Sequence, residues 1–332
     1  MNTPASTPMP TPTAAQRAKR VLLLSYSQSG QLAAVAEQII APLREAPGIE
    51  VHVEWLRPQP AYPFPWPFFR FLDAFPESAL MQPPALAPLS LGGDEHFDLV
   101  IIPYQVWFLA PSAPITAFLK HPIGQRLLQG KPVVTVIACR NMWLLAQEKM
   151  KGLLSDCGAR LIDNVVLIDP GPTLATFITT PRWVLTGKRD GFWGLPPAGL
   201  SLAQISGTRR FGRALRDALG RDAERASAPL LAGLGAVQAD PRLYISEKAG
   251  TRSFFLWGSL LRAAGAPGSR QRLPLLVAYL VFLVLMIATV VPVSLFLQAV
   301  LRPLLAAWLG RIKHQFETPS GSAKDRLPLY ED

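Results

Sequence analysis

The chain has 332 residues, of which 49% are hydrophobic, enough for a sizeable core and, by length, about two domains. Its 33 Lys and Arg exceed its 23 Asp and Glu, giving a net charge of +10. Much of this excess surrounds a C-terminal apolar segment, so a membrane surface explains it better than a nucleic-acid partner, and we expect no nucleic acid. The two cysteines form no CxxC pair and the four histidines are scattered, so we expect no metal site.

The N-terminal region predicts a phosphate-binding turn. Residues 1–19 are rich in Pro, Thr, Ser and Ala, which predicts a disordered tail without a signal peptide, and hence a cytoplasmic start. An apolar strand over Val21–Leu24 then leads into a helix over Gln31–Leu43. The connecting turn offers hydroxyl groups, a glycine that allows close approach and the amide groups of a helix start, which together favour an anion. The hydroxyl residues are Ser25, Ser27 and Ser29. An ordinary strand–helix turn with a capping Ser is the alternative.

Three more strands continue an alternating α/β pattern after an edge strand at Val51–Leu56. They are expected over Phe97–Pro103, Pro132–Ala138 and Leu161–Ile168, with helices over Ala113–Lys120 and Leu144–Asp156. This order favours a doubly wound parallel sheet with helices on both faces. Residues 58–91 interrupt it with a Pro- and aromatic-rich insertion, which is either packed on the domain surface or forms an apolar lid or membrane-touching loop beside the site.

The C-terminal part predicts a membrane segment. Thr173–Gly199 is expected to be irregular, and Ser201 to cap a helix through Leu219 that closes a domain over residues 20–222. Residues 223–272 form a basic linker with helical pieces. Leu273–Leu301 contains no charge, and as a helix would be about 43 Å long against a bilayer core of about 30 Å. We expect one membrane segment over 273–310, kinked at Pro292 and followed by an interfacial helix, with a hairpin as the alternative and a polar tail over 311–332.

Three loops should meet where the parallel strands end, because ligands bind there in open α/β sheets. The loop at Ser25–Gln31 suits a phosphate. The loop at Tyr104–Pro111 offers the flat rings of Tyr104, Trp107 and Phe108, and the loop at Cys139–Trp143 offers a cation and an amide. A phosphate, a planar ring and a polar edge together suit a flavin mononucleotide (FMN).

The loop Ser25–Gln31 resembles the phosphate loop of the flavodoxin-like family, and Asp98–Lys120 is similar to its third strand, flavin loop and following helix. The resemblance covers residues 20–222 and implies a five-stranded sheet of order 2-1-3-4-5 that binds FMN. Leu32 stands where the family commonly has Thr. The implied phosphate residues are Ser25, Ser27, Gln28, Ser29, Gly30 and Gln31. The implied ring residues are Val106, Trp107 and Phe108, with Cys139, Arg140 and Asn141 at the pyrimidine edge.

Over its full length the chain resembles bacterial proteins labelled dialkylresorcinol condensing enzyme, through Phe64–Phe71, Ala138–Trp143 and the apolar C-terminus. That resemblance implies an FMN protein of the oxidative aromatisation step, working with a ketosynthase. We therefore expect a membrane-anchored FMN oxidoreductase that acts on a hydrophobic, aromatic-polyketide or lipid-like substrate. Its FMN domain would lie on the cytoplasmic side of the inner membrane, among membrane lipid, with NAD(P)H as a candidate electron donor.

Arg140 and Tyr104 are the candidate catalytic residues. Arg140 would stabilise negative charge on the reduced flavin, and Tyr104 would shield its ring or donate a proton, a role for which Cys139 is a second candidate. Two other functions remain open: a flavodoxin-like electron carrier, and a non-enzymatic membrane scaffold that has lost the flavin. The basic charge disfavours the carrier, since carriers benefit from acidic docking surfaces.

Overall fold

The computed structural model describes residues 17–331, so most of the predicted N-terminal tail lies outside the described residues. Its centre is a sheet of five parallel strands in the order β2-β1-β5-β7-β8, which is 2-1-3-4-5 in chain order. This confirms the predicted flavodoxin-like arrangement. The strands are β1 (Lys19–Ser25), β2 (Ile49–Trp55), β5 (Leu99–Trp107), β7 (Pro132–Cys139) and β8 (Arg160–Ile168).

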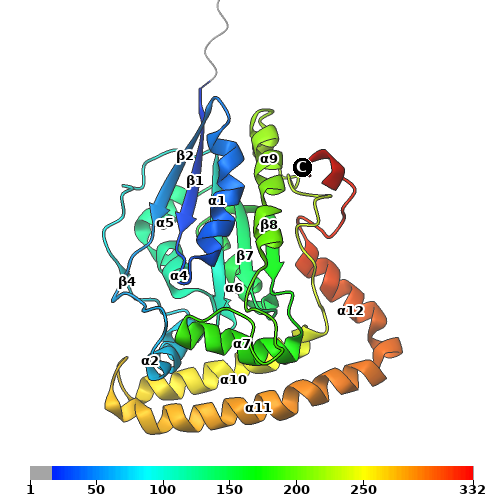
Figure 1. Ribbon diagram of the computed structural model, residues 1–332. Coiled ribbons are helices and arrows are strands. Elements are labelled where there is room, and N and C mark those ends of the chain that lie inside the picture. Colours follow the sequence, from blue (N-terminus) through cyan, green and yellow to red (C-terminus); the bar gives the residue numbers. More distant parts are fainter. Residues whose placement is uncertain (1–16, 332) are drawn as a thin grey trace, which may run out of the picture.

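Helices cover both faces of this sheet (Figure 1). On one face lie α1 (Gln31–Arg44), α8 (Leu202–Ser206) and α9 (Arg209–Leu219). On the other lie α4 (Ala113–Lys120), α5 (Pro122–Leu128) and α6 (Leu144–Asp156). The central strands are apolar on both faces, as expected of a parallel sheet covered twice, and Val21, Leu22 and Leu24 are fully buried. β2 forms one edge, as its half-polar pattern predicts.

The insertion at residues 58–91 contains two short helices and a small two-stranded sheet. β3 (Pro58–Gln59) pairs with β4 (Ala85–Leu86), and α2 (Phe68–Asp73) and α3 (Phe75–Ala79) lie between them. A further short strand, β6 (Ala110–Pro111), folds back on the end of β5.

Two sequence predictions after β8 are wrong. Thr173–Gly199 is not irregular, because α7 (Thr173–Thr186) occupies its first half despite five Thr and an internal proline, and ends at Gly187 in the left-handed region. Packing overrides the low helix propensity of these residues. Ser201 does cap a helix, through a capping box with Gln204, but the chain breaks at Gly207 and Thr208 before α9 begins.

The C-terminal third forms a helical layer across the carboxyl end of the sheet (Figure 1). Its helices are α10 (Leu243–Ala264), α11 (Leu273–Val300) and α12 (Arg302–Glu317), with the short 3-10 turns η1 (Ala223–Arg225), η2 (Arg270–Arg272) and η3 (Leu327–Leu329) elsewhere after residue 222. The region predicted as a basic linker therefore holds a 22-residue helix, α10. α11 runs antiparallel along α10 (Figure 1), and Phe254 packs edge-on against Tyr279.

Among the described residues, one helix is long and apolar enough to cross a membrane: the stretch Arg270–Ser294, whose most apolar 18-residue window has a mean hydropathy of 2.8 and is 12% buried. Length and composition alone are weak evidence of a span, because buried core helices pass the same test. In the structure this helix stays against α10 rather than leaving the protein.

The predicted polar tail is instead part of the folded domain. Ser320 is buried and donates from Oγ to Asp163 Oδ1 at 2.7 Å, while Asn164 N donates to Ser320 Oγ at 2.7 Å. Near the end of the chain, Arg213 donates to the Tyr330 carbonyl at 2.8 Å. The tail thus helps to cover the edge of the sheet at β8, and Ser320 adds a third donor to the buried Asp163 carboxylate, which also accepts from Leu230 N and Leu231 N.

Ser320→Ala should lower the free energy of unfolding by about 1–3 kcal/mol, because it removes one of three donors to the buried Asp163 carboxylate and leaves the Asn164 amide without the acceptor it has here. Urea titration of the full chain measures this change. The exposed Ser206, replaced by Ala as a control, should change stability by less than about 0.5 kcal/mol. Equal, small effects at both positions would show that the tail does not depend on this contact.

Candidate functional site

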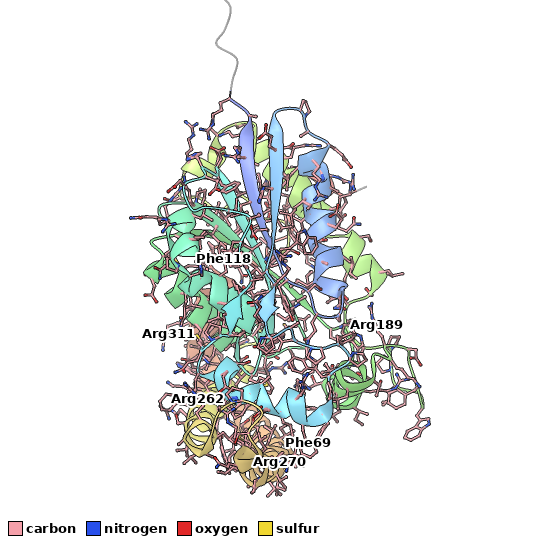
Figure 2. The ribbon with its side chains drawn as sticks, turned by 90° about the vertical axis from the view of Figure 1, so that its left-hand side faces the viewer. Phe69, Phe118, Arg189, Arg262, Arg270 and Arg311 are labelled. Atoms are coloured by element: carbon pink, nitrogen blue, oxygen red, sulfur yellow. The ribbon has the colours of Figure 1, made fainter. Side chains whose placement is uncertain are left out.

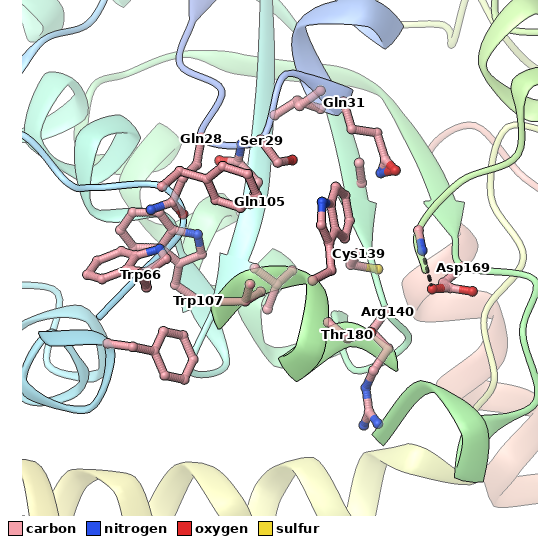
Figure 3. A pocket seen from close by; sticks show the side chains of 18 of the residues that line it. Gln28, Ser29, Gln31, Trp66, Gln105, Trp107, Cys139, Arg140, Asp169 and Thr180 are labelled. Carbon is pink, nitrogen blue, oxygen red and sulfur yellow. Dashed lines mark hydrogen bonds between the residues drawn. The ribbon is translucent and has the colours of Figure 1, made fainter. Parts of the chain in front are cut away.

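A cavity of about 280 Å³ lies where β1, β5 and β7 end, at the point where the strand order reverses (Figure 3). Parallel α/β sheets bind ligands at this position. The cavity collects side chains from the turn after β1, the end of β5, the turn after β7, the insertion and α7. Its polar and aromatic lining includes Gln28, Ser29, Gln31, Phe64, Trp66, Gln105, Trp107, Cys139, Arg140, Asp169, Thr180 and Trp183.

The turn between β1 and α1 has the features of an anion cradle. Ser27 Oγ is buried without a hydrogen-bond partner among the described residues. Gly30 has a φ of 83°, and a Cβ there would meet nothing within 4 Å, so the turn is open at this residue. No side chain caps the start of α1, which leaves the helix amides and the positive end of its dipole for a ligand.

Not every predicted phosphate residue faces the cavity. Ser29 and the two glutamines line it, whereas Ser27 and Gly30 are not among its lining residues and Ser25 is buried in the end of β1. The Gln28 side chain donates to the Pro63 carbonyl at 3.0 Å, and Gln31 Oε1 accepts from Leu200 N at 2.8 Å. These two side chains therefore tie the turn to the insertion and to the segment after α7, and are not free for a phosphate.

Aromatic rings form one wall of the cavity. Trp107 meets Tyr26, Tyr62 and Trp66 edge-on, with ring centres 6.0, 5.0 and 5.8 Å apart. Val106 and Phe108, also predicted beside the ring, line the cavity too. Burial raises the pKa of the Tyr62 hydroxyl to about 12, so it is protonated at neutral pH. The wall is aromatic and uncharged.

The insertion contributes directly to this wall, since Phe64, Trp66 and Phe71 line the cavity. The Trp66 amide also donates to the Val184 carbonyl in α7 at 2.9 Å, so insertion and α7 close over the cavity together. Of the two interpretations of the insertion, its position beside the cavity favours the apolar lid.

The prediction for Tyr104 is wrong. Its side chain is fully buried and its hydroxyl donates to Gln147 Oε1 at 2.6 Å, inside the layer between β5 and α6. The reason is that β5 does not end at Pro103 but continues to Trp107, so alternation turns Tyr104 away from the face that Gln105 and Trp107 present. Burial raises its pKa well above the usual tyrosine range, and it cannot exchange a proton with a ligand in the cavity.

Only part of the polar edge that was predicted for the turn after β7 lies in the cavity. Cys139 lines the cavity, but burial raises the pKa of its thiol, so it is no ready acid or base. Arg140 also lines it, with its guanidinium 3.8 Å from the centre of the Phe177 ring and pointing away from Gln31 (Figure 3). Asn141 does not line this cavity; it faces a second one, described below.

Four residues that the sequence did not single out complete the lining. Gln105 Oε1 and Thr180 Oγ1 are buried without a partner among the described residues. Asp169 accepts from Gly171 N at 2.8 Å and Gly199 N at 2.6 Å, which fixes the segment after β8. Trp183 comes from α7, which the sequence did not predict. Of these four residues, Gln105 alone could have been predicted from the sequence, because it directly precedes Val106 in the predicted flavin loop.

These residues fit FMN. An unpartnered hydroxyl and uncapped helix amides suit its phosphate, a wall of aromatic rings suits its flat ring, and unpartnered Gln105 and Thr180 oxygens suit polar groups on the ring.

Comparison with known proteins gives limited further information. No family model matches the chain, and no curated protein matches it. Among solved structures, a flavoprotein in complex with FMN from Lactobacillus acidophilus NCFM is 16% identical, with a TM-score of 0.35 over 46% of this chain and 93% of its own. An archaeal flavodoxin is 12% identical, with a TM-score of 0.32 over 60% of this chain and 99% of its own. At this level of similarity, the chain's own strand order and cavity are the stronger evidence.

A buried carboxylate supports the floor of the site. Glu247 of α10 accepts from Leu144 N at 3.2 Å and Leu145 N at 2.7 Å, and so caps the start of α6 directly after the Cys139–Trp143 turn. Burial raises the pKa of Glu247 to about 7, although these hydrogen bonds oppose the rise.

Because this pKa lies above the ordinary value of 4.5, the folded protein binds more protons than the unfolded chain between the two. The free energy of unfolding should therefore fall as pH rises toward 7. Asp163, whose pKa burial raises to about 6, adds to the fall only at lower pH. Urea titrations from pH 6 to 7.5 should show this slope in the native chain and a flatter one in Glu247→Gln. An unchanged slope would mean that Glu247 stays ionised throughout.

Proposed function

We propose that the chain is an FMN-dependent oxidoreductase for a hydrophobic, flat substrate. The observation that carries this is the unpartnered Ser27 hydroxyl beside the uncapped start of α1, in a turn whose Gln28, Ser29 and Gln31 line an aromatic cavity at the sheet's reversal point. When bound, FMN supplies the electron or hydride transfer. The chain supplies binding, orientation and exclusion of water.

The residues divide into three tasks. The turn at residues 27–31 would hold the phosphate through its amides and the Ser27 hydroxyl. Trp66 and Trp107 would contact the ring and keep water from it. Gln105 and Thr180 would hydrogen-bond the ring's polar edge, and the Arg140 cation, held by Phe177, would favour negative charge that develops nearby.

A second, larger cavity is the proposed substrate chamber. It has a volume of about 1510 Å³ and is bounded by α7, the start of α10, α11 and α12. Arg140 lines the first cavity and stacks on Phe177, which lines the second, so this residue pair links the linings of the two cavities. The lining of the second cavity is mostly apolar and includes Leu174, Ile178, Ile287 and Leu309.

Two adjoining cavities suit a substrate with an aromatic ring and alkyl chains. Its ring would reach the flavin and its chains would occupy the chamber. This supports the finer proposal of oxidative aromatisation in dialkylresorcinol-type biosynthesis, with a ketosynthase supplying the ring precursor. In that direction two electrons and two protons would pass from the precursor to FMN and then to an acceptor such as a quinone. NAD(P)H would be the electron donor only when the same flavin works in the reductive direction.

The visible spectrum of purified full-length protein tests the proposal first. Flavin absorbance, or its recovery after adding FMN, is expected, and a protein that stays colourless with FMN would leave only a non-enzymatic role. Rapid NAD(P)H oxidation with a quinone or cyclohexanedione acceptor would then indicate an enzyme. One-electron exchange alone would indicate an electron carrier.

Ser27→Ala should weaken FMN binding roughly tenfold to 100-fold, because a hydrogen bond to a charged acceptor contributes about 1.5–3 kcal/mol. Titration of flavin fluorescence measures the change, with Ser206→Ala on the surface as control. Equal FMN affinity in the two variants would place the phosphate elsewhere.

Ala306→Trp should fill part of the proposed substrate chamber, since Ala306 of α12 lines it. We expect KM for long-chain acceptors to rise several-fold while FMN affinity stays unchanged. Ala278→Trp on α11, outside the chamber lining, is the matched control. A loss of FMN binding, or no change in KM, would contradict the assignment of the chamber.

A further inference from the structure

The base of the molecule is an extended apolar face without a protein partner. It consists of the outward sides of α10 and α11 together with the exposed rings of α2, and we call it the basal face. Figure 2 looks along α10 and α11 and shows Phe69 of α2 beside them. Its exposed apolar residues include Phe68, Phe69, Phe255, Leu256, Leu260, Val277, Val281, Val284, Leu285 and Val293. A surface of this kind in water marks an interaction site.

The charge around this face is strongly one-sided. From residue 241 to 316 the sequence has a single acidic residue, Glu247, which is buried. The basic residues of the same stretch are Arg242, Lys248, Arg252, Arg262, Arg270, Arg272, Arg302, Arg311 and Lys313. Arg252 and Arg270 are exposed and have no carboxylate within ion-pair distance among the described residues. Apolar side chains with unneutralised cations complement an anionic lipid surface.

The contacts of α11 fix its orientation on that surface. At its start, Arg272 is buried and pairs with Glu77 at 2.8 Å and Asp73 at 3.2 Å. Near its other end, Ser294 hydrogen-bonds Ser246 of α10 at 2.7 Å. A helix held at both ends against the same domain presents its side, not its end, to a bilayer.

We propose that the protein docks on anionic membranes through the basal face, with α11 lying along the surface instead of crossing it. Association of two copies through this face is disfavoured, because it would bring their cations together. Docking does not depend on flavin binding. It would place α11, which bounds the second cavity, at the lipid surface.

Flotation of the full chain with vesicles tests the binding. The protein should float with vesicles of phosphatidylcholine and phosphatidylglycerol, more weakly with phosphatidylcholine alone, and less as salt rises. Arg252→Glu with Arg270→Glu should lower affinity for anionic vesicles roughly 25-fold, at about fivefold per cation removed. Arg44→Glu with Arg221→Glu, at the opposite end of the sheet, is the control pair and should bind as the native chain does.

Depth measurement tests the orientation. Ala278→Cys, Leu285→Cys and Phe296→Cys sample one exposed side of α11 along most of its length, with the unsubstituted chain as labelling blank. A fluorophore at each site, quenched by lipids spin-labelled at known depths, should report one shallow depth for all three. A deepest value at Leu285 would show a spanning helix. No flotation, flotation indifferent to charge, or a concentration-dependent dimer without lipid binding would also overturn the proposal.

Discussion

The Glu247 carboxylate is the interaction on which the arrangement of the site depends. By accepting the first amides of α6, it holds α10 across the end of the sheet where the cavity forms. α11 packs on α10, α12 returns toward Trp143 through Phe316, and the tail reaches β8 through Ser320. The helical layer thus forms the floor of the cavity that lies at the carboxyl end of the sheet. The buried carboxyl group of Glu247, whose ionisation is disfavoured by burial, joins this layer to the sheet domain.

The strands and the β1–α1 turn could be predicted because each apolar run is local and bounded by turn residues. The end of β5 could not be predicted from the sequence, because a proline such as Pro103 normally ends a strand. Here it lies beyond the last pairing of β1 with β5, at Leu23 and Ile101, so its missing N–H costs no hydrogen bond to β1. The same divergence of β1 from β5 opens the cavity. Tyr104 was misplaced for this reason.

α7 was missed, and α10 was expected only as helical pieces of a linker, for another reason. The first is rich in Thr and contains Pro181, and the second mixes basic, polar and apolar residues without a clean stripe. Both are stabilised by tertiary contacts that no local pattern contains. Thr180 and Trp183 were missed with α7, which shows that the site depends on packing as much as on its loops.

The central claim is that the β1–α1 turn binds the phosphate of a flavin. Comparing FMN with riboflavin in a fluorescence titration of the full chain tests it most directly, because the two ligands differ only in that phosphate. The account predicts tight, quenched binding of FMN and at least tenfold weaker binding of riboflavin, from the loss of one or more charged hydrogen bonds of about 1.5–3 kcal/mol each. Equal affinity for both, or none for either, would contradict it.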